Sequence, residues 1–450
     1  MKRRTSLLLA AVVALVAHRA EALHLAGEGR KTSARDLSLE VRRVALPNGM
    51  VVLLAPDPTA SSVLVWMTFR AGTVYEPPRR SGLAHLVEHI MTSGPTRETD
   101  YATLLEERRA RIVNGATDFE MMRFETVAPP EELPLALWVA ADRLGSIPPL
   151  IDAGVVQRNR NVVLQERAFR DVDVPYGLVR ERLFSRLFAA PHPLHGGVGG
   201  VPAELALVTP EEVRTFVAEH LTAANATLTV VGRFDPAQAQ TLIEETLGGL
   251  PARTRVKTPA FNAPAGDLVD SKEETVAREP GVTMAWRLAR LGHDEASALK
   301  LGAQLLSIYT DGAFGMRIAA DLQEQASESL FFFEFTVPYD ETASAVQGDA
   351  EGFLRQLTGR EMPFELLRIA NLALDRVALF SLDSIQGRAL RLDRLEQLFG
   401  SRINVADDCA GHWMHDPVTV HDTARAYLHS AKVIVHARPT RPRPPRTEPE

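Results

Sequence analysis

Residues 81–94, with the sequence SGLAHLVEHIMTSG, combine the residue types best suited to chemistry in this chain. His85, Glu88 and His89 form the pattern H-x-x-E-H. On a helix, which turns by about 100° per residue, the three side chains share one face. Two imidazoles one turn apart can bind one Zn²⁺, and the carboxylate between them can take a proton from a water molecule. The pattern therefore predicts a zinc site; the alternative is an amphipathic helix with polar residues at its rim.

A catalytic zinc also needs a third protein ligand and an open position for water. Residues 155–170 have a helical pattern and contain NRNVVLQER, in which Glu166 is the best candidate for that ligand. The 76 positions from 90 to 165 separate Glu166 from His89. On spacing alone, a surface ion pair between Glu166 and its neighbour Arg167 is an equally good interpretation.

A second group of potential ligands is Cys409, His412 and His415 in CAGHWMH. A metal site there would need a fourth donor, so a solvated helix end is the favoured interpretation. Cys409 is the only cysteine in the sequence. An internal disulfide and a cysteine-based structural zinc site are therefore excluded.

The chain has 450 residues, 45% of them hydrophobic, and a formal net charge of -7. This length predicts at least two domains. Both ends of the chain are basic, so the body between them is more acidic than the net charge implies. Binding to a phosphate backbone needs a basic face, and a nucleic-acid partner is therefore not expected.

The N-terminus has the features of a secretory signal peptide over residues 1–22. Three basic residues precede an apolar run at 7–17, which is followed by the small-residue pattern Ala20-Glu21-Ala22. The run has about half the length of a membrane-spanning helix. We therefore expect removal near Ala22, no membrane span in the mature chain, and a periplasmic or secreted protein.

The element pattern indicates two lobes of similar fold. In the first, at 41–250, Asn48-Gly49 predicts a tight turn between two apolar strands within 41–56. Residues 251–280 are rich in Pro, Ala and charge and are interpreted as a linker. The second lobe is predicted at 281–436, and the Pro- and Arg-rich tail at 437–450 is expected to be disordered. The remaining expected elements are strands at 61–71, 226–232, 281–288, 330–337 and 432–436, and helices at 82–92, 100–111, 130–144, 155–170 and 293–306.

Because strands alternate with helices, the pattern indicates an α/β or an α+β fold, and we predict α+β. The expected architecture is two similar α/β sandwich lobes, each with a mixed sheet covered by helices, joined by the linker. The similar order of elements in the two halves suggests two copies of one fold.

Four segments and one spacing together resemble the pitrilysin/insulinase family of inverted-motif zinc peptidases, in particular its half-length members related to the mitochondrial processing peptidase. The segments are SGLAHLVEH, VVLQER, DVDVPYG and ATLTVVGRFDP, and the spacing is the 76 residues between His89 and Glu166. The resemblance implies that His85, His89 and Glu166 ligate Zn²⁺ and that Glu88 is the general base. It also implies that Asn114, in NGATDFE, positions the substrate backbone from an edge strand. On local grounds alone, Asn114 is equally well a turn residue before Gly115.

The chain departs from the family pattern at three positions. Asn159 replaces a second Glu that the family has seven residues before the ligand, which removes a negative charge near the metal. In the second half, Gln323 and Leu330 replace an Arg and a Tyr that hold the substrate. Gln has no charge and Leu has no hydroxyl to donate to an oxyanion.

The resulting functional hypothesis is a zinc endopeptidase that hydrolyses peptides or unfolded polypeptides. The missing Arg and Tyr predict that it is the catalytic subunit of a hetero-oligomer whose homologous partner supplies them. The alternative is a non-catalytic scaffold or chamber subunit of the same family. The intact set of His85, Glu88, His89 and Glu166 favours the first hypothesis, and Gln323 and Leu330 favour the second.

Overall fold

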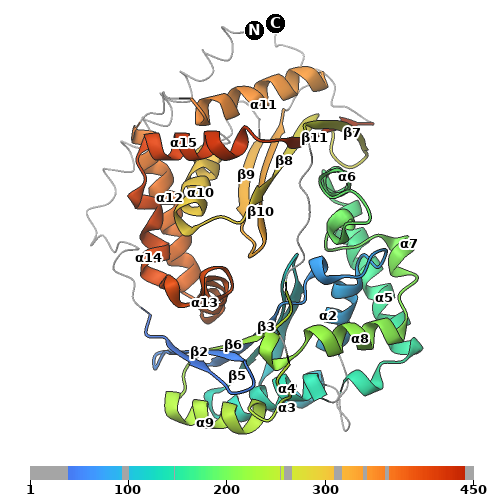
Figure 1. Ribbon diagram of the computed structural model, residues 1–450, viewed down its shortest axis with the longest axis vertical. Helices are drawn as coiled ribbons and strands as arrows, with labels where there is room; N and C mark the ends of the chain where they lie inside the picture. The colour runs from blue at the N-terminus through green and yellow to red at the C-terminus, as the bar shows by residue number, and fades with distance from the viewer. Residues whose placement is uncertain are drawn as a thin grey trace, which may run out of the picture.

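The computed structural model describes residues 39–93, 101–145, 147–253, 255–257, 266–308, 317–337, 342–359 and 364–440. Two α/β lobes, each built on a mixed sheet with helices packed against it, make up the molecule (Figure 1). The predicted fold class is therefore confirmed. The signal peptide predicted at 1–22 lies outside the described residues and stays a prediction.

Within the described residues, the sheet of the first lobe has six strands in the order β1-β2-β6-β3-β5-β4. Gly49, with a φ of 90°, lies in the turn between the antiparallel strands β1 and β2, as Asn48-Gly49 predicts. β2 pairs with β6 in parallel, and the other pairs are antiparallel. The strands are β1 (Arg42–Ala45), β2 (Val51–Pro56), β3 (Val63–Phe69), β4 (Arg111–Thr117), β5 (Met122–Ala128) and β6 (Ala226–Gly232).

The second sheet repeats this topology without a counterpart of β1. Its order is β7-β11-β8-β10-β9, with one parallel pair, β7 and β11, followed by antiparallel pairs. In chain order both sheets therefore read 1-5-2-4-3, which confirms the predicted repeat of one fold. The strands are β7 (Leu268–Glu274), β8 (Gly281–Ala289), β9 (Arg317–Gln323), β10 (Glu328–Thr336) and β11 (Lys432–Pro439).

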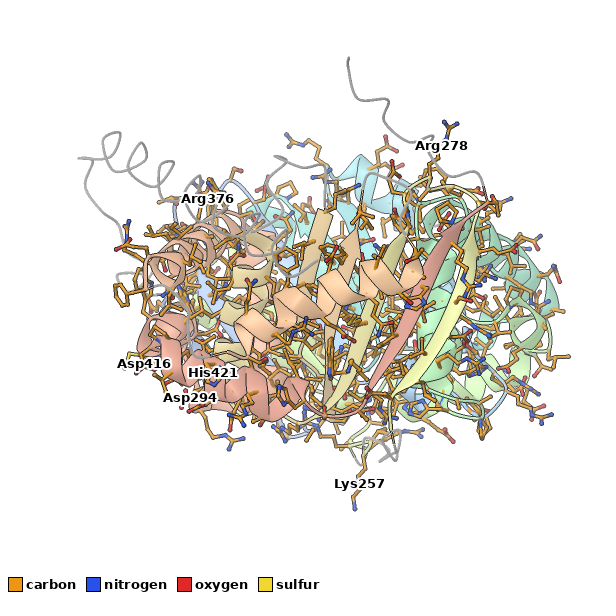
Figure 2. The ribbon with its side chains drawn as sticks, turned by 90° about the horizontal axis from the view of Figure 1, so that it is seen from above. Lys257, Arg278, Asp294, Arg376, Asp416 and His421 are labelled. Carbon is orange, nitrogen blue, oxygen red and sulfur yellow. The ribbon has the colours of Figure 1, made fainter. Side chains whose placement is uncertain are left out.

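The helices repeat in the same order. α2 (Leu83–Ser93) lies between β3 and β4, as α10 (His293–Ile308) lies between β8 and β9. α5 (Ala153–Arg167) is the second α-helix after β5, and α12 (Phe364–Leu382) is the second after β10. α11 (Ala343–Leu357) lies across the strands of the second sheet (Figure 2). In the same view, the exposed side chains of Arg278 and Asp294 point outward from the molecule. Other helices are α3 (Tyr101–Glu107), α4 (Leu133–Gly145), α6 (Gly177–Leu187), α7 (Pro202–Leu205), α8 (Pro210–His220), α9 (Pro236–Leu247), α13 (Ile385–Phe399), α14 (Val405–Ala410) and α15 (Pro417–Leu428).

Each lobe covers one face of the other lobe's sheet. α13 of the second lobe packs on β3 and β6, where Leu392 and Leu395 join a core cluster with Trp66. α6 of the first lobe packs on β7, β8 and β11, and Leu330 and Val433 belong to the core of the first lobe. Alternate residues of each strand thus face opposite cores, as the period of a strand requires.

A buried carboxylate also joins the lobes. Glu120, in the turn between β4 and β5, accepts hydrogen bonds from the backbone N–H groups of Ala326 and Ser327 at 2.6 and 2.8 Å. These two residues form part of the turn between β9 and β10. The edge strand β4 of the first lobe is therefore tied to the β9–β10 hairpin of the second.

Two segment predictions need correction. Strand β7 lies inside the predicted linker at 251–280. Its sequence LVDSKEE forms a partly exposed edge strand with few apolar side chains, which composition does not distinguish from a linker. The first residues of the predicted tail at 437–450 continue β11, whose backbone pairs in parallel with β7. Backbone hydrogen bonds form without apolar side chains, so the amino-acid composition does not reveal β7 or the end of β11. Residues 441–450 lie outside the described residues.

In the part of the chain that the structure describes, no helix is both long enough and apolar enough to cross a membrane.

Candidate metal centre

Helix α2, which carries H-x-x-E-H, is held at both ends by buried polar side chains. At its start, the Glu76 carboxylate accepts hydrogen bonds from the N–H groups of Gly82 (3.1 Å) and Ala84 (2.8 Å). At its end, Arg143 Nε donates to the Met91 carbonyl at 2.8 Å. An acidic group at a helix N-terminus and a cation at its C-terminus both interact favourably with the helix dipole. Glu76 and Arg143 cannot be recognised as site residues from the sequence alone, because neither belongs to a periodic pattern.

The donor atoms of His85, His89 and Glu166 converge. The two Nε2 atoms are 3.1 Å apart, and Glu166 Oε2 lies 2.9 Å from His89 Nε2 and 3.5 Å from His85 Nε2. A tetrahedral Zn²⁺ with bonds of about 2.0–2.1 Å holds its ligand atoms roughly 3.3 Å apart. The three donors and their spacing therefore fit a zinc ion with a fourth position left open.

Glu166 reaches the histidines from α5, which packs against α2. Asp152 caps the start of α5 by accepting from the Val155 N–H at 2.8 Å. At the other end, Arg170 Nη1 lies 2.5 Å from Glu166 Oε1, the oxygen that faces away from the imidazoles. The structure therefore contradicts the alternative pairing of Glu166 with Arg167, whose guanidinium pairs with Glu181 instead.

Glu88 lies beside the three donors but is oriented differently. Its Oε2 is 3.8 Å from His85 Nε2, and its Oε1 accepts from Thr92 Oγ1 at 3.3 Å. Gly115, on β4, packs directly against this carboxylate. Glu166 therefore lies closer than Glu88 to the point where the imidazole nitrogens meet, and Glu88 is free to act on a molecule bound there.

Burial shifts the pKa values of two of these groups in opposite directions. It raises the pKa of Glu88 to about 7, with the nearby Glu166 adding to the effect. It lowers the pKa of His85 to about 4, with His89 adding to the effect. Without a metal, both groups thus favour their neutral forms, as expected in a site with a low dielectric constant.

The site opens into a cavity of about 680 Å³, a size typical of ligand sites. Asn114 lines this cavity from β4. It lies at a bulge in an edge strand whose pairing partner in the described structure is β5. The alternative prediction, a turn at Asn114-Gly115, is therefore wrong. The other lining residues include Tyr101, Thr117, Arg167, Asp171 and Gly199.

Asn159 does not line this cavity. Its Nδ2 donates to the Val155 carbonyl at 2.9 Å, and its Oδ1 accepts from Ser93 Oγ at 3.3 Å. Asn159 therefore connects α5 to the end of α2 and borders a small neighbouring cavity.

Gln323 and Leu330 face each other across β9 and β10. Gln323 is exposed at the edge of the sheet, whereas Leu330 is 1% exposed and packs in the core of the first lobe. Leu330 therefore has a packing role and Gln323 lies at the sheet edge, and neither side chain is suited to holding an oxyanion.

The residues of CAGHWMH do not form a metal site. Cys409 Sγ accepts from Arg391 Nη1 at 3.1 Å, and His412 Nε2 lies 3.1 Å from Asp375 Oδ1. Among the described residues, the one group of three or more potential ligands with converging donors contains His85, Glu88 and His89.

Gly115→Ala should slow catalysis without releasing zinc. A Cβ atom at position 115 would overlap Glu88 Oε1 and Thr92 Oγ1, and the flexible carboxylate would have to move. We expect a loss of about tenfold or more in kcat at unchanged zinc content, measured by peptide hydrolysis and metal analysis. Gly145→Ala is the matched control, because nothing lies within 4 Å of its added Cβ. Equal kcat values for the two variants would contradict the contact.

The metal-free protein should show opposing pH effects on stability. Between about pH 4.5 and 7, folded Glu88 keeps a proton that the unfolded chain has lost, so its contribution to stability falls as the pH rises. Between about pH 4 and 6.5, unfolded His85 keeps a proton that the folded chain lacks, so its contribution falls as the pH drops.

Glu88→Gln removes the first effect and leaves the second. From pH 6.5 to pH 4, the free energy of unfolding of this variant should therefore fall by about 2 kcal/mol relative to that of the wild type. Urea denaturation in the presence of a chelator measures this difference. Parallel pH profiles for the variant and the wild type would rule out the assigned shifts.

Comparison with known proteins identifies the family of the chain. Residues 51–191 match the family profile described as "Insulinase (Peptidase family M16)", and residues 207–349 match "Peptidase M16 inactive domain". The two matches together span more than half of the chain. The fold and the site define a class, the two-lobed proteins with an inverted zinc-peptidase motif. Within this class, the chain belongs to peptidase family M16.

Individual relatives are distant. The chain is 24% identical to the zinc protease PqqE of Helicobacter pylori, over 58% of this chain and 60% of that protein. It is 30% identical to the coenzyme PQQ synthesis protein F of Pseudomonas aeruginosa, over 59% of this chain and 35% of that protein. It is 25% identical to the mitochondrial-processing peptidase subunit beta of Lentinula edodes, over 46% and 44%. The matched regions thus span less than two thirds of each relative.

The fold has a near match among solved structures. The crystal structure of a protease from Helicobacter pylori superimposes with a TM-score of 0.80 over 89% of this chain and 100% of that chain, at 19% identity. At this identity the match supports the fold alone.

Proposed function

We propose that this protein is a zinc-dependent endopeptidase in which His85, His89 and Glu166 bind Zn²⁺. The observation that supports it best is the convergence of three donor atoms, at 2.9 to 3.5 Å from one another, beside a buried Glu88. When bound, zinc would act as a Lewis acid on the peptide carbonyl and lower the pKa of a coordinated water to about 7.

Glu88 is the general acid and base. Its carboxylate accepts a proton from the attacking water and returns it to the leaving amine. Glu88 lies in the cavity wall between His85 and Gly115, where it can contact both the attacking water and the leaving amine. The hydrogen bond from Thr92 holds Oε1 and leaves Oε2 on the side of the donors.

The exposed edge of β4 provides a binding surface for the substrate backbone. An extended peptide can add to an open sheet edge through main-chain hydrogen bonds. Asn114, at the bulge of that edge, borders the cavity and can hold the backbone near the metal. Substrates are therefore peptides or unfolded segments, because a folded chain does not offer an extended strand.

The hetero-oligomer is part of this proposal. Gln323 and Leu330 offer no positively charged or hydroxyl group, so a homologous partner has to supply the Arg and Tyr. One relative is itself named as a subunit, the beta subunit of the mitochondrial-processing peptidase. The competing proposal, a non-catalytic subunit, rests on the same two residues.

Peptide hydrolysis separates these proposals. We expect the isolated chain to be nearly inactive on an unfolded polypeptide and a chain reconstituted with its co-purifying partner to be active, with a chelator abolishing that activity. Full activity of the isolated chain would disprove the need for a partner. Inactivity of the zinc-loaded complex would disprove catalysis and favour the scaffold.

We also propose that the mature protein is exported to the periplasm or secreted. The basic start, apolar run and Ala20-Glu21-Ala22 pattern support this. N-terminal sequencing of protein from its native source tests it. A mature chain that begins near residue 23 is expected, and an intact residue 1 would contradict export by cleavage.

A further inference from the structure

The second lobe has a cavity where the first lobe has its metal centre. By order of elements, α10, β9 and α12 are the counterparts of α2, β4 and α5. A cavity of about 320 Å³ is bordered by α10, α12, α13 and the turn after β9. In place of potential zinc ligands, α10 contributes Ser297 and Lys300 to its wall.

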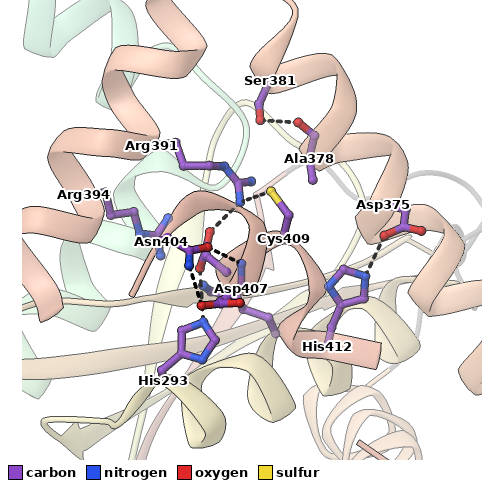
Figure 3. Close-up of polar contacts among 12 residues, drawn as sticks. His293, Asp375, Ala378, Ser381, Arg391, Arg394, Asn404, Asp407, Cys409 and His412 are labelled. Atoms are coloured by element: carbon purple, nitrogen blue, oxygen red, sulfur yellow. Dashed lines mark hydrogen bonds and ion pairs between the residues drawn. The ribbon is translucent and has the colours of Figure 1, made fainter. Parts of the chain in front are cut away.

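The residues that line this cavity include more positively charged than negatively charged side chains. Lys300 Nζ lies 2.6 Å from Glu324 Oε2, and Arg394 pairs with the same carboxylate. Arg391, on α13, pairs with Asp408. Its Nη1 also donates a hydrogen bond to Cys409 Sγ (Figure 3). The lining itself therefore has three cations and two carboxylates, and Asp321, outside the lining, is a further anion that acts on Lys300 and Arg394.

The rest of the wall is mainly apolar. Leu374 and Val377 come from α12, and Leu390, Leu395 and Leu398 come from α13. Val377 and Leu390 are 60% and 46% exposed, so the cavity opens to the surface between the two helices. An opening of this kind admits a ligand without any change in the fold.

We infer that this cavity binds a small molecule with one carboxylate and an apolar tail, the carboxylate contacting Lys300 and Arg394 and the tail lying between α12 and α13. A carboxylate would pair with the cations of the lining, and charge-assisted hydrogen bonds to a carboxylate are strong in such surroundings. A free fatty acid and the C-terminal residue of a peptide both have this chemistry. The inference does not depend on the proposed zinc site.

Binding should depend on pH through Lys300. Burial lowers the pKa of Lys300 to about 7, with Arg394 and Arg391 adding to the effect and Asp408 and Asp321 opposing it. Glu324 is its direct partner, and the other titratable groups nearby are Cys409, His412 and His293. Because an anionic ligand favours the charged amine, its affinity should fall as the pH rises above about 7.

Calorimetric titration of the full chain tests the inference, with octanoate as the fatty-acid probe, N-acetyl-leucine as the peptide-terminus probe and 1-octanol as the uncharged control. We expect one carboxylate probe to bind at pH 6.5 at least tenfold more tightly than octanol. Tighter binding of octanoate would identify the ligand as a fatty acid. Tighter binding of N-acetyl-leucine would identify it as the C-terminus of a peptide. Octanol binding as tightly as either carboxylate would overturn the inference.

Variants locate the binding. Lys300→Gln should weaken carboxylate binding about tenfold or more, whereas Lys300→Arg should keep it and remove its pH dependence. Val377→Asp puts a negative charge at the exposed mouth and should weaken binding without affecting the core. Val418→Asp, at a residue 62% exposed on α15, is its matched control. Unchanged affinity in both Lys300→Gln and Val377→Asp would refute the site.

Discussion

Glu88→Gln should leave zinc bound and slow peptide hydrolysis by two to four orders of magnitude, which is typical for the loss of a general base. The amide keeps the shape of the side chain and its contacts with Thr92 and Gly115. It cannot accept the proton of the attacking water. The effect should appear in kcat of the zinc-loaded complex, with the zinc content unchanged by metal analysis.

Glu106→Gln is the matched control for this change, because Glu106 is an exposed residue of α3. Its activity and its zinc content should equal those of the wild type. Loss of zinc in Glu88→Gln would make Glu88 a ligand, and retained activity would remove it from the mechanism.

His85→Ala and Glu166→Ala should each lower zinc affinity by more than about 100-fold. Even partners that only orient a ligand typically contribute 10- to 100-fold, and each of these changes removes one of three ligands. Activity should fall in proportion to the bound metal. Titration with zinc against a competing chelator measures the affinity directly.

The matched controls are His429→Ala and Glu245→Ala, both at exposed positions outside the cavity. These should bind zinc as the wild type does. Full zinc occupancy in His85→Ala would show that the ions bind elsewhere.

The sequence was sufficient to predict the elements that carry the site. H-x-x-E-H on an apolar helix can be recognised because helix periodicity places its side chains on one face. Glu166 lies on another helix, and its role as a ligand is what the family resemblance implies. The elements of the repeated fold can be recognised because buried strands such as β6 and β8 consist mainly of apolar residues. Both signals are local.

Other features depend on contacts between distant segments. Glu76 and Arg143 hold α2 from opposite ends, yet each is an ordinary charged residue in the sequence. β7 is polar and partly exposed, and its pairing with β11 brings together residues more than 150 positions apart. The exchange of α6 and α13 between the lobes follows from packing of whole sheets, which no local pattern encodes.

The central claim is that His85, His89 and Glu166 hold one zinc ion beside Glu88. An anomalous difference map from crystals grown with zinc, measured at the zinc absorption edge, tests it most directly. We predict one strong peak about 2.0–2.2 Å from His85 Nε2, His89 Nε2 and a carboxylate oxygen of Glu166. A peak coordinated by other residues, or none at these three atoms in zinc-saturated crystals, would contradict the claim.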